Sequence, residues 1–263
     1  MTNMTNTAAL LALMQVSDSA FPSGAFVHSY GLEQLVREQR ITDALALERF
    51  VTSVLEGSLA TADAPVAYAA ASARNINDLI EIDRALFGMK AASELREACV
   101  GTGRRFLDEA SFLHDQESHP HVAEEAAYPL SLREKAGVRV PLPEKRQTTG
   151  YLAAVRTGAT PGCYPVAYGV VCRDLGVAPT DVPGVFLLGA LTAILQSAMR
   201  LMRVSHRDVQ AALHALRPQI ASIADGIISL KAGASRPTLH AFNPMQDIAS
   251  MRHECAEARL FAS

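Results

Sequence analysis

The segment DALALERFVTSVLEGSL, residues 43–59, carries apolar side chains at the spacing of an amphipathic helix. Its apolar positions recur every three or four residues, as Leu47, Phe50, Val51, Val54, Leu55 and Leu59. Thr42 or Asp43 can accept hydrogen bonds from the free amides at the start of such a helix. The segment therefore predicts a helix with one face buried in a hydrophobic core.

Helical spacing recurs along most of the chain beyond this segment. Asp63 followed by Pro65 predicts a helix start with proline in the first turn, and that helix runs to Ala73. Apolar spacing, caps and closing glycines predict further helices at 76–87, 95–107, 165–175, 180–204, 209–216 and 220–228. Alanine and leucine are abundant and only 6% of residues are aromatic, which favours helices over strands. We therefore expect an all-α fold, with a single helical-bundle domain of roughly ten helices at residues 1–236.

Two stretches lack this spacing. Residues 114–149 hold four prolines and three histidines without sustained periodicity, which predicts an inserted, mobile loop. The second stretch begins near Gly233 and passes through Pro237 to an apolar ending. Its glycine and proline content predicts a flexible C-terminal tail, residues 237–263, that docks onto a partner.

The charge balance restricts the class of partner. The chain has 263 residues, with 24 basic and 27 acidic side chains and a formal net charge of -3. This near-neutral balance gives no positive electrostatic potential that would bind the phosphate backbone of a nucleic acid. A hydrophobic content of 49% is too high for a disordered chain. Residues 182–199 are uncharged but diluted by proline, glycine and polar side chains. We therefore expect no nucleic-acid partner, and a buried core helix at 182–199 rather than a membrane span.

Two features indicate the compartment. Residues 1–17 lack the positive charge of a secretory signal. The four cysteines, Cys99, Cys163, Cys172 and Cys255, are scattered and form no CxxC pair. Such cysteines are typical of reduced thiols, so we expect a cytoplasmic protein.

Enzyme motifs are missing as a group. The sequence has no GxSxG elbow, no GxxxxGK[ST] phosphate loop, no GxGxxG fingerprint and no HExxH pair. His28 and His206 flank apolar segments without an identifiable carboxylate partner. We therefore expect no catalytic residues, no cofactor and no enzyme activity, although a helical hydrolase stays an alternative because a nucleophile and its base can be remote in sequence.

Metal binding is a second alternative. His114, His119 and His121 lie within eight residues together with Asp115 and Glu117. Structural metal sites draw their ligands from a rigid frame, and this run contains proline and no cysteine, so a solvated loop is favoured. A nickel-binding role through this loop, or through Cys163 and His253, stays open.

Residues 17–33, SDSAFPSGAFVHSYGLE, are unusual for a loop and helix start. Proline and glycine define a turn, while Phe21, Phe26 and Tyr30 offer apolar area at little entropy cost. This pattern suits an interface anchor as well as a turn beneath the core. The candidate interface residues are Asp18, Phe21, Pro22, Gly24, Phe26, Ser29, Tyr30, Gly31 and Glu33.

This segment resembles the N-terminal signature of the UreF family, in which Phe-Pro-x-Gly-x-Phe precedes a Ser-Tyr/His-Gly-Leu-Glu helix start. Three more motifs follow in the family's order: PVAYG at 165–169, QSAMR at 196–200, and DIASMRHE at 247–254 with a terminal Arg-Leu-Phe. Two positions depart from the family pattern. The turn VSHRDVQ at 204–210 lacks the family's glycines, and Cys163 stands where histidine is common.

The resemblance implies an all-helical, non-catalytic protein that dimerises. It implies a scaffold that bridges UreD (UreH) to the GTPase UreG, so that nickel reaches the urease apoprotein. The family's tail is expected to be disordered alone and to order on UreD. The implied UreD-binding residues are Ser250, Met251, Arg252, His253, Glu254, Arg259, Leu260 and Phe261.

Overall fold

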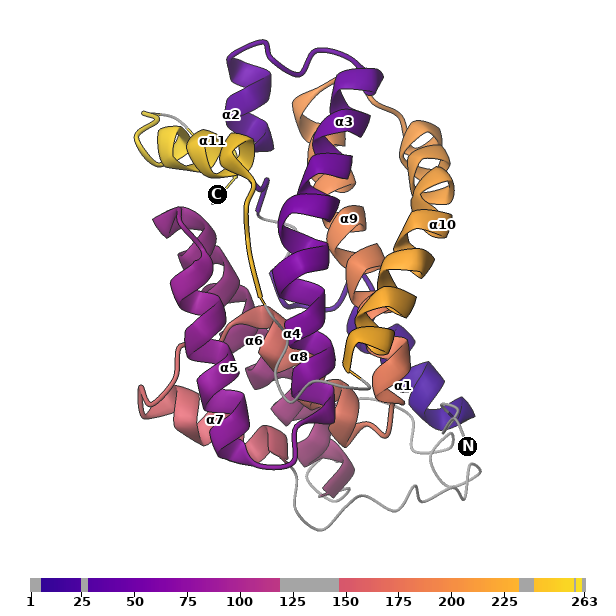
Figure 1. Ribbon diagram of the computed structural model, residues 1–263, viewed down its shortest axis with the longest axis vertical. Coiled ribbons are helices and arrows are strands. Elements are labelled where there is room, and N and C mark those ends of the chain that lie inside the picture. The colour runs from indigo at the N-terminus through magenta and orange to yellow at the C-terminus, as the bar shows by residue number, and fades with distance from the viewer. Residues whose placement is uncertain (1–5, 25–27, 119–146, 232–238, 258, 262–263) are drawn as a thin grey trace, which may run out of the picture.

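A computed structural model describes residues 6–24, 28–118, 147–231, 239–257 and 259–261. These residues form eleven α-helices and no β-strand, which confirms the expected all-α fold (Figure 1). In chain order the α-helices are α1 (Thr7–Ser17), α2 (Leu32–Arg37), α3 (Ala44–Val54), α4 (Ala64–Ser72), α5 (Ile76–Met89), α6 (Ser93–Ser118), α7 (Gln147–Arg156), α8 (Tyr164–Asp174), α9 (Val182–Leu201), α10 (His206–Lys231) and α11 (Pro244–Glu254). A π-helix, η2 (Leu55–Asp63), joins α3 to α4, and a 3₁₀ turn, η5 (Pro179–Asp181), precedes α9.

The core is built around α4 and α8, which pack closely because their facing residues are small. A side chain at Gly169 would meet the carbonyl oxygen of Ala67 and the Cβ of Ala70. Glycine in the PVAYG motif therefore allows the two helices to touch through their backbones. Phe106 of α6 packs beside them, with its ring centroid 5.4 Å from that of Tyr164 and 5.8 Å from that of Tyr168.

The apolar helix α9 packs against α4 and α10, and most of its side chains are buried. Among the described residues, 179–201 form the single helix whose length and composition would allow it to cross a membrane. Its burial inside the bundle matches the core helix expected from the sequence.

The predicted helix start at Asp63 is wrong. Residues 44–72 form one continuous helix, in which α3 passes through η2 into α4 (Figure 1). Asp63 keeps helical dihedral angles and caps no backbone amide; its carboxylate binds Lys90 Nζ at 2.8 Å. The helix continues because its apolar face stays buried through Leu55 and Leu59.

Two further boundaries differ from the sequence-based expectation. The predicted loop at 114–149 is helical at both ends, since α6 extends to Ser118 and α7 begins at Gln147. The two predicted helices at 209–216 and 220–228 are one helix, α10, with Pro218 inside it. Pro218 is exposed, so the carbonyl group that loses its helical hydrogen bond faces water.

Candidate partner-binding site

The N-terminal motif and the C-terminal segment, which the sequence presents as separate candidates, meet in one place. We call residues 239–257 and 259–261 the C-terminal arm. Its helix α11 packs against α2 and α6 (Figure 1). His253 of the arm contacts Glu33 of α2 across 220 positions of sequence.

The backbone at the start of α2 is shaped to receive α11. Tyr30 and Gly31 both adopt left-handed dihedral angles, with φ of 55° and 83°. A side chain at Gly31 would lie 3.1 Å from the carbonyl oxygen of Gln246 and 3.2 Å from Ser250 Oγ. Glycine at this position therefore satisfies both the backbone conformation and the close approach of α11.

Three side chains, which we call the Glu–His–Glu cluster, join α2, α6 and α11. His253 is 0% exposed. Its Nε2 lies 3.0 Å from Glu33 Oε2, and its Nδ1 lies 2.7 Å from Glu94 Oε1. Both ring nitrogens thus lie at hydrogen-bond distance from carboxylate oxygens, so the imidazole is held in one orientation.

Glu33 also fixes the end of the arm. Its Oε1 accepts a hydrogen bond from the Leu260 N–H at 2.8 Å, and its Oε2 accepts one from the Phe261 N–H at 2.9 Å. The Phe261 ring is buried beneath the Arg200 guanidinium, 5.9 Å from the ring centroid. Arg259 Nη1 lies 3.6 Å from Glu94 Oε1. The terminal Arg-Leu-Phe sequence is therefore bound to the body of its own chain.

The two carboxyl groups of the cluster differ in proton affinity. Burial raises the pKa of Glu33, but the hydrogen bonds from Leu260, Phe261 and His253 outweigh burial and hold this pKa below its usual value. For Glu94, burial outweighs the contacts with His253 and Arg259, and its pKa is raised.

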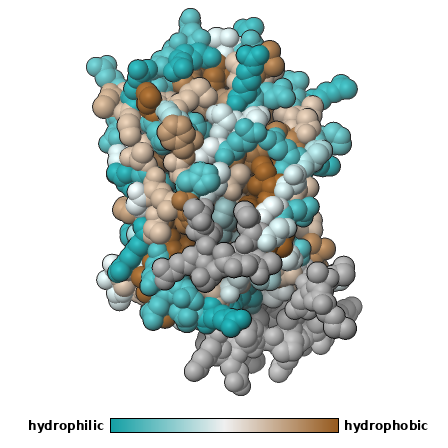
Figure 2. All heavy atoms as spheres, in the orientation of Figure 1, coloured by the Kyte–Doolittle hydropathy of each residue, from teal (hydrophilic) through white to brown (hydrophobic). Residues whose placement is uncertain are grey.

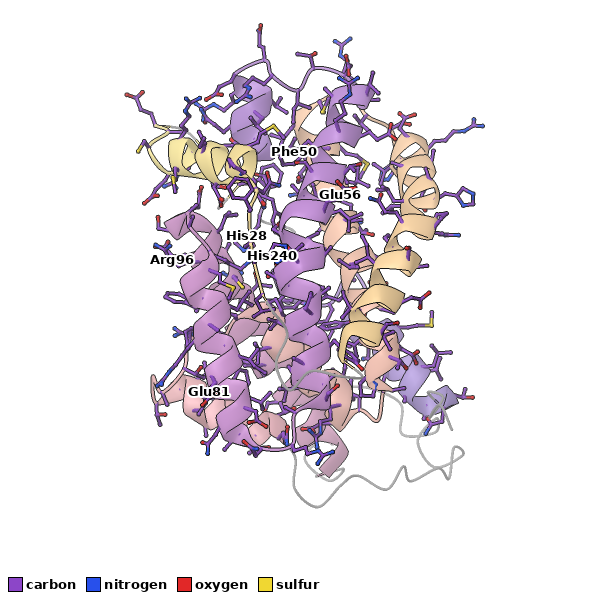
Figure 3. The ribbon with its side chains drawn as sticks, viewed as in Figure 1. His28, Phe50, Glu56, Glu81, Arg96 and His240 are labelled. Atoms are coloured by element: carbon purple, nitrogen blue, oxygen red, sulfur yellow. The ribbon has the colours of Figure 1, made fainter. Side chains whose placement is uncertain are left out.

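The arm reaches this cluster along the carbonyl groups of α3 and η2. The Phe242 N–H donates to the Gly57 carbonyl at 2.9 Å, and the His240 N–H donates to the Thr61 carbonyl at 3.3 Å. Figure 3 labels His240 on the segment that runs beside the helix. Asn243 Nδ2 donates to the Ser53 carbonyl at 3.0 Å. The Gly57 carbonyl also accepts from Thr61 Oγ1 at 3.1 Å, so the arm adds its bonds to those within η2.

A small cavity of about 50 Å³ lies between the arm and the body. Its lining includes His28, Tyr30, the Asp63–Lys90 ion pair and Gln246 of the arm. Burial, followed by the nearby Arg105 charge, lowers the pKa of His28 to about 4, so this imidazole is neutral at physiological pH.

The outer face of the arm is apolar. Met251 is 43% exposed and Ile248 is 47% exposed, and the two lie three positions apart on one face of α11. Leu260 is 65% exposed beyond them. In Figure 2 hydrophobic side chains interrupt the hydrophilic surface at the upper left, over α11. We call Ile248, Met251 and Leu260 the arm patch.

The structure distributes the N-terminal candidates between surface and interior. Phe21, Ser29, Gly31 and Glu33 are buried, and the Phe21 ring centroid lies 5.2 Å from that of Phe106. Asp18 and Pro22 are exposed, whereas Gly24 and Tyr30 are half-buried. Phe26 lies outside the described residues. The buried candidates cannot contact a partner directly and can support an interface only by packing under its exposed residues.

The tail candidates divide in the same way. Ser250, His253 and Phe261 are buried against the body, whereas Met251, Arg252, Glu254, Arg259 and Leu260 are exposed. The expected flexible tail thus differs from the structure, in which the arm is packed. The physical reason is the set of buried polar bonds that Glu33 and Glu94 offer it.

The metal candidates are not brought together. His119 and His121 lie outside the described residues, and for His114 the structure describes only the backbone of α6. Cys163 is fully buried, and its hydrogen bond with Cys99, together with burial, raises its pKa, which opposes the thiolate that a metal needs. The part of the chain that the structure describes holds no metal-binding group of three or more His, Cys, Asp or Glu side chains.

Sequence reasoning did not assign Glu94, Arg200 or Gly57 to this site. Arg200 ends the QSAMR motif and Glu94 lies on another helix, and no local spacing marks either as a partner of the arm. A side chain at Gly57 would meet the Phe242 carbonyl oxygen at 2.9 Å, a constraint that exists only once the arm is in place. The arrangement as a whole offers a fixed platform for binding, made of an apolar patch with charged neighbours.

Comparison with known proteins agrees with this reading of the motifs. A sequence model of the UreF family matches residues 41–217. The urease accessory protein UreF of Photorhabdus laumondii is 28% identical over 261 residues, which cover 98% of this chain and 100% of that protein. UreF 2 of Brucella canis is 29% identical over 255 residues, covering 96% and 91% of the two chains. The chain belongs to the UreF family of urease accessory proteins.

Proposed function

We propose that this chain is a non-catalytic scaffold for urease maturation in the cytoplasm. As a homodimer, it bridges UreD (UreH) to the GTPase UreG, so that nickel reaches the urease apoprotein. Membership of a family of urease accessory proteins supports the role in urease maturation. The observation that carries the bridging role is the arm, which is fixed on its inner face and apolar on its outer face.

A surface of this kind suits recognition of a protein. The arm patch offers large apolar side chains, and the bonds of the inner face hold the patch in place before a partner arrives, which reduces the entropy lost on binding. Arg252, Glu254 and Arg259 surround the patch with exposed charges. An apolar centre with a polar rim is the usual anatomy of a protein–protein interface. We assign the arm patch to UreD.

The test uses single substitutions in the arm patch. Full-length protein carrying Met251→Asp or Leu260→Asp is mixed with UreD and then with UreG, and the complexes are sized by chromatography with light scattering. We expect wild-type protein to form a complex with both partners. Each variant should weaken UreD binding by roughly tenfold or more, because an aspartate in the interface must be desolvated.

The matched control is Leu45→Asp, because Leu45 is 57% exposed on α3, away from the arm. This control should bind UreD as wild type does. Unchanged UreD binding by both arm variants would contradict the assignment. Truncation after Pro237 is a coarser test, because it removes UreD contacts and also uncovers the buried Glu33 and Glu94.

A further inference from the structure

Two cysteines that the proposed function does not use lie together in the body of the chain. Cys99 is on α6, and Cys163 directly precedes α8. Both carry free thiols, and a hydrogen bond joins their side chains. Neither residue belongs to the arm, so the pair does not depend on where the arm lies. Two thiols in contact are the arrangement from which a disulfide can form.

The close approach of α6 brings the two thiols together. Gly103 lies one helical turn after Cys99, and a side chain at Gly103 would meet the Cys163 carbonyl carbon at 2.8 Å and the Tyr164 nitrogen at 2.7 Å. Helix α6 is therefore packed directly against the backbone of Cys163. Cys99 shares this face of α6, because residues four positions apart lie above one another on a helix.

Asp83 fixes Cys163 from the opposite side. The Cys163 N–H donates to Asp83 Oδ1 at 2.8 Å, and Cys163 Sγ lies 3.9 Å from the Asp83 carbonyl oxygen. The Cys163 side chain is fully buried. With its backbone bound and its thiol enclosed, Cys163 has little freedom left to lose when a covalent bond forms. Cys163 also stands where the family pattern has histidine, so the resemblance does not imply this pair.

The two thiols differ in access to a small reagent. Cys99 is half-buried and lines the cavity of about 50 Å³ together with Thr102 and Lys90. A polar cavity of this volume admits a molecule the size of water, and hydrogen peroxide is larger by a single oxygen atom. The contact with Cys99, followed by burial, raises the pKa of Cys163, which keeps it protonated. An oxidant therefore meets Cys99 first, and Cys163 is placed to react second.

We propose that Cys99 and Cys163 form a site of reversible oxidation, at which hydrogen peroxide converts the two thiols into one intrachain disulfide. The Cys99 sulfur attacks the O–O bond of the peroxide, becomes a sulfenic acid and releases one water. Cys163 Sγ then displaces the hydroxyl group, which leaves with the Cys163 proton as a second water. Two electrons pass from the two sulfurs to the peroxide. A dithiol reductant reverses the reaction by thiol–disulfide exchange.

The experiment is peptide mapping of the full-length protein before and after treatment with hydrogen peroxide. Remaining thiols are blocked with N-ethylmaleimide in denaturant, and the protein is digested without reductant for mass spectrometry. We expect one linked pair of peptides, joined through Cys99 and Cys163 and separated by dithiothreitol. Contact within the fold raises the effective concentration of one thiol at the other, so this pair should exceed every other pair by about tenfold or more. Protein unfolded in urea before oxidation should lose this preference.

Three serine variants test the order of the reaction. Cys163→Ser should leave Cys99 as a sulfenic acid, which a dimedone probe captures, because the second thiol is missing. Cys99→Ser should form no disulfide at Cys163. Cys255→Ser is the matched control: Cys255 is exposed and distant in sequence from the pair, and its loss should leave the Cys99–Cys163 link unchanged. If Cys163→Ser does not fold, the peptide map of the wild-type protein still decides.

Urea denaturation tests whether the fold presents the pair ready to bond. A disulfide restricts the unfolded chain, so the oxidised protein should unfold at a higher urea concentration than the reduced protein. The absence of a Cys99–Cys163 link would overturn the proposal, as would a sulfinic acid on Cys99 as the main product or a lower urea midpoint after oxidation. None of these measurements needs UreD or UreG, so failure of the proposed function would leave their result standing.

Discussion

Asp83 is fully buried in α5, and it organises a turn in another part of the chain. Its carboxylate accepts hydrogen bonds from Thr160 Oγ1 at 2.6 Å, from the Gly162 N–H at 2.7 Å and from the Cys163 N–H at 2.8 Å. These donors lie just before α8, so Asp83 holds the turn that leads into the central helix. A single acidic side chain thereby fixes the position of the core.

The variant Asp83→Asn should therefore be strongly destabilised. An asparagine has one oxygen in place of two and turns an N–H₂ group toward a backbone N–H, so a buried donor loses its acceptor. We expect the free energy of unfolding, measured by urea denaturation, to fall by about 2–4 kcal/mol. Asp108→Asn, which breaks the exposed pair with Arg156, should cost less than about 1 kcal/mol. Equal losses in the two variants would refute this role for Asp83.

At the scale of elements, most helices could be predicted from apolar spacing, because each buries one face in the core. The start of α7 could not, since Gln147 and Thr148 donate their amides to Asp174, which lies on a different helix. The π-helix η2 could not either. Asp63 and Pro65 look like a helix start, but the helix continues because its apolar face stays buried through Leu55 and Leu59.

Gly57→Ala tests whether η2 holds the arm. An added Cβ would lie 2.9 Å from the Phe242 carbonyl oxygen, so the arm must move away. We expect hydrogen exchange at His240 and Phe242 to become about tenfold faster. Gly226→Ala on α10, where nothing lies within 4 Å of the added Cβ, is the control and should stabilise its helix by about 0.5–1 kcal/mol. An arm that exchanges at the wild-type rate in Gly57→Ala would show that the contact is dispensable.

At the scale of the whole molecule, the sequence predicted the fold class and both candidate surfaces, but placed them apart. The match to the UreF family model, residues 41–217, contains neither the N-terminal motif nor the arm. Contact between Glu33 and His253 spans 220 positions, and no periodicity within one sequence encodes such a distance. The contact between the N-terminal motif and the C-terminal arm could therefore not be predicted from the sequence.

Global stability should depend on pH through His28. Its pKa falls from 6.5 to about 4 on folding, so between these values the unfolded state binds more protons than the folded state. Stability is therefore fully present above about pH 6.5 and is lost as the pH falls toward 4, by roughly 3 kcal/mol in total. Urea denaturation at several pH values measures this slope.

The variant His28→Gln should flatten that slope, whereas His214→Gln, at an exposed position on α10, should leave it unchanged. The slope persisting in His28→Gln would assign the acid sensitivity to other groups. Glu33 would act at more acidic pH than His28. Because its pKa is lowered on folding, its contribution to stability is lost as the pH falls below the usual pKa of a carboxyl group.

The π-helix also sets a rotational phase between two halves of the molecule. It packs more residues into each turn than an α-helix does, so α4 is turned about the common axis relative to α3. Deleting one residue within 55–63 without a change in winding would rotate α4 by roughly a quarter of a turn about the common axis. The small face at Ala67 and Ala70 would then point away from Gly169. Chain length in this short stretch is therefore under a double constraint, because the same residues contact the arm and keep α4 in phase with α8.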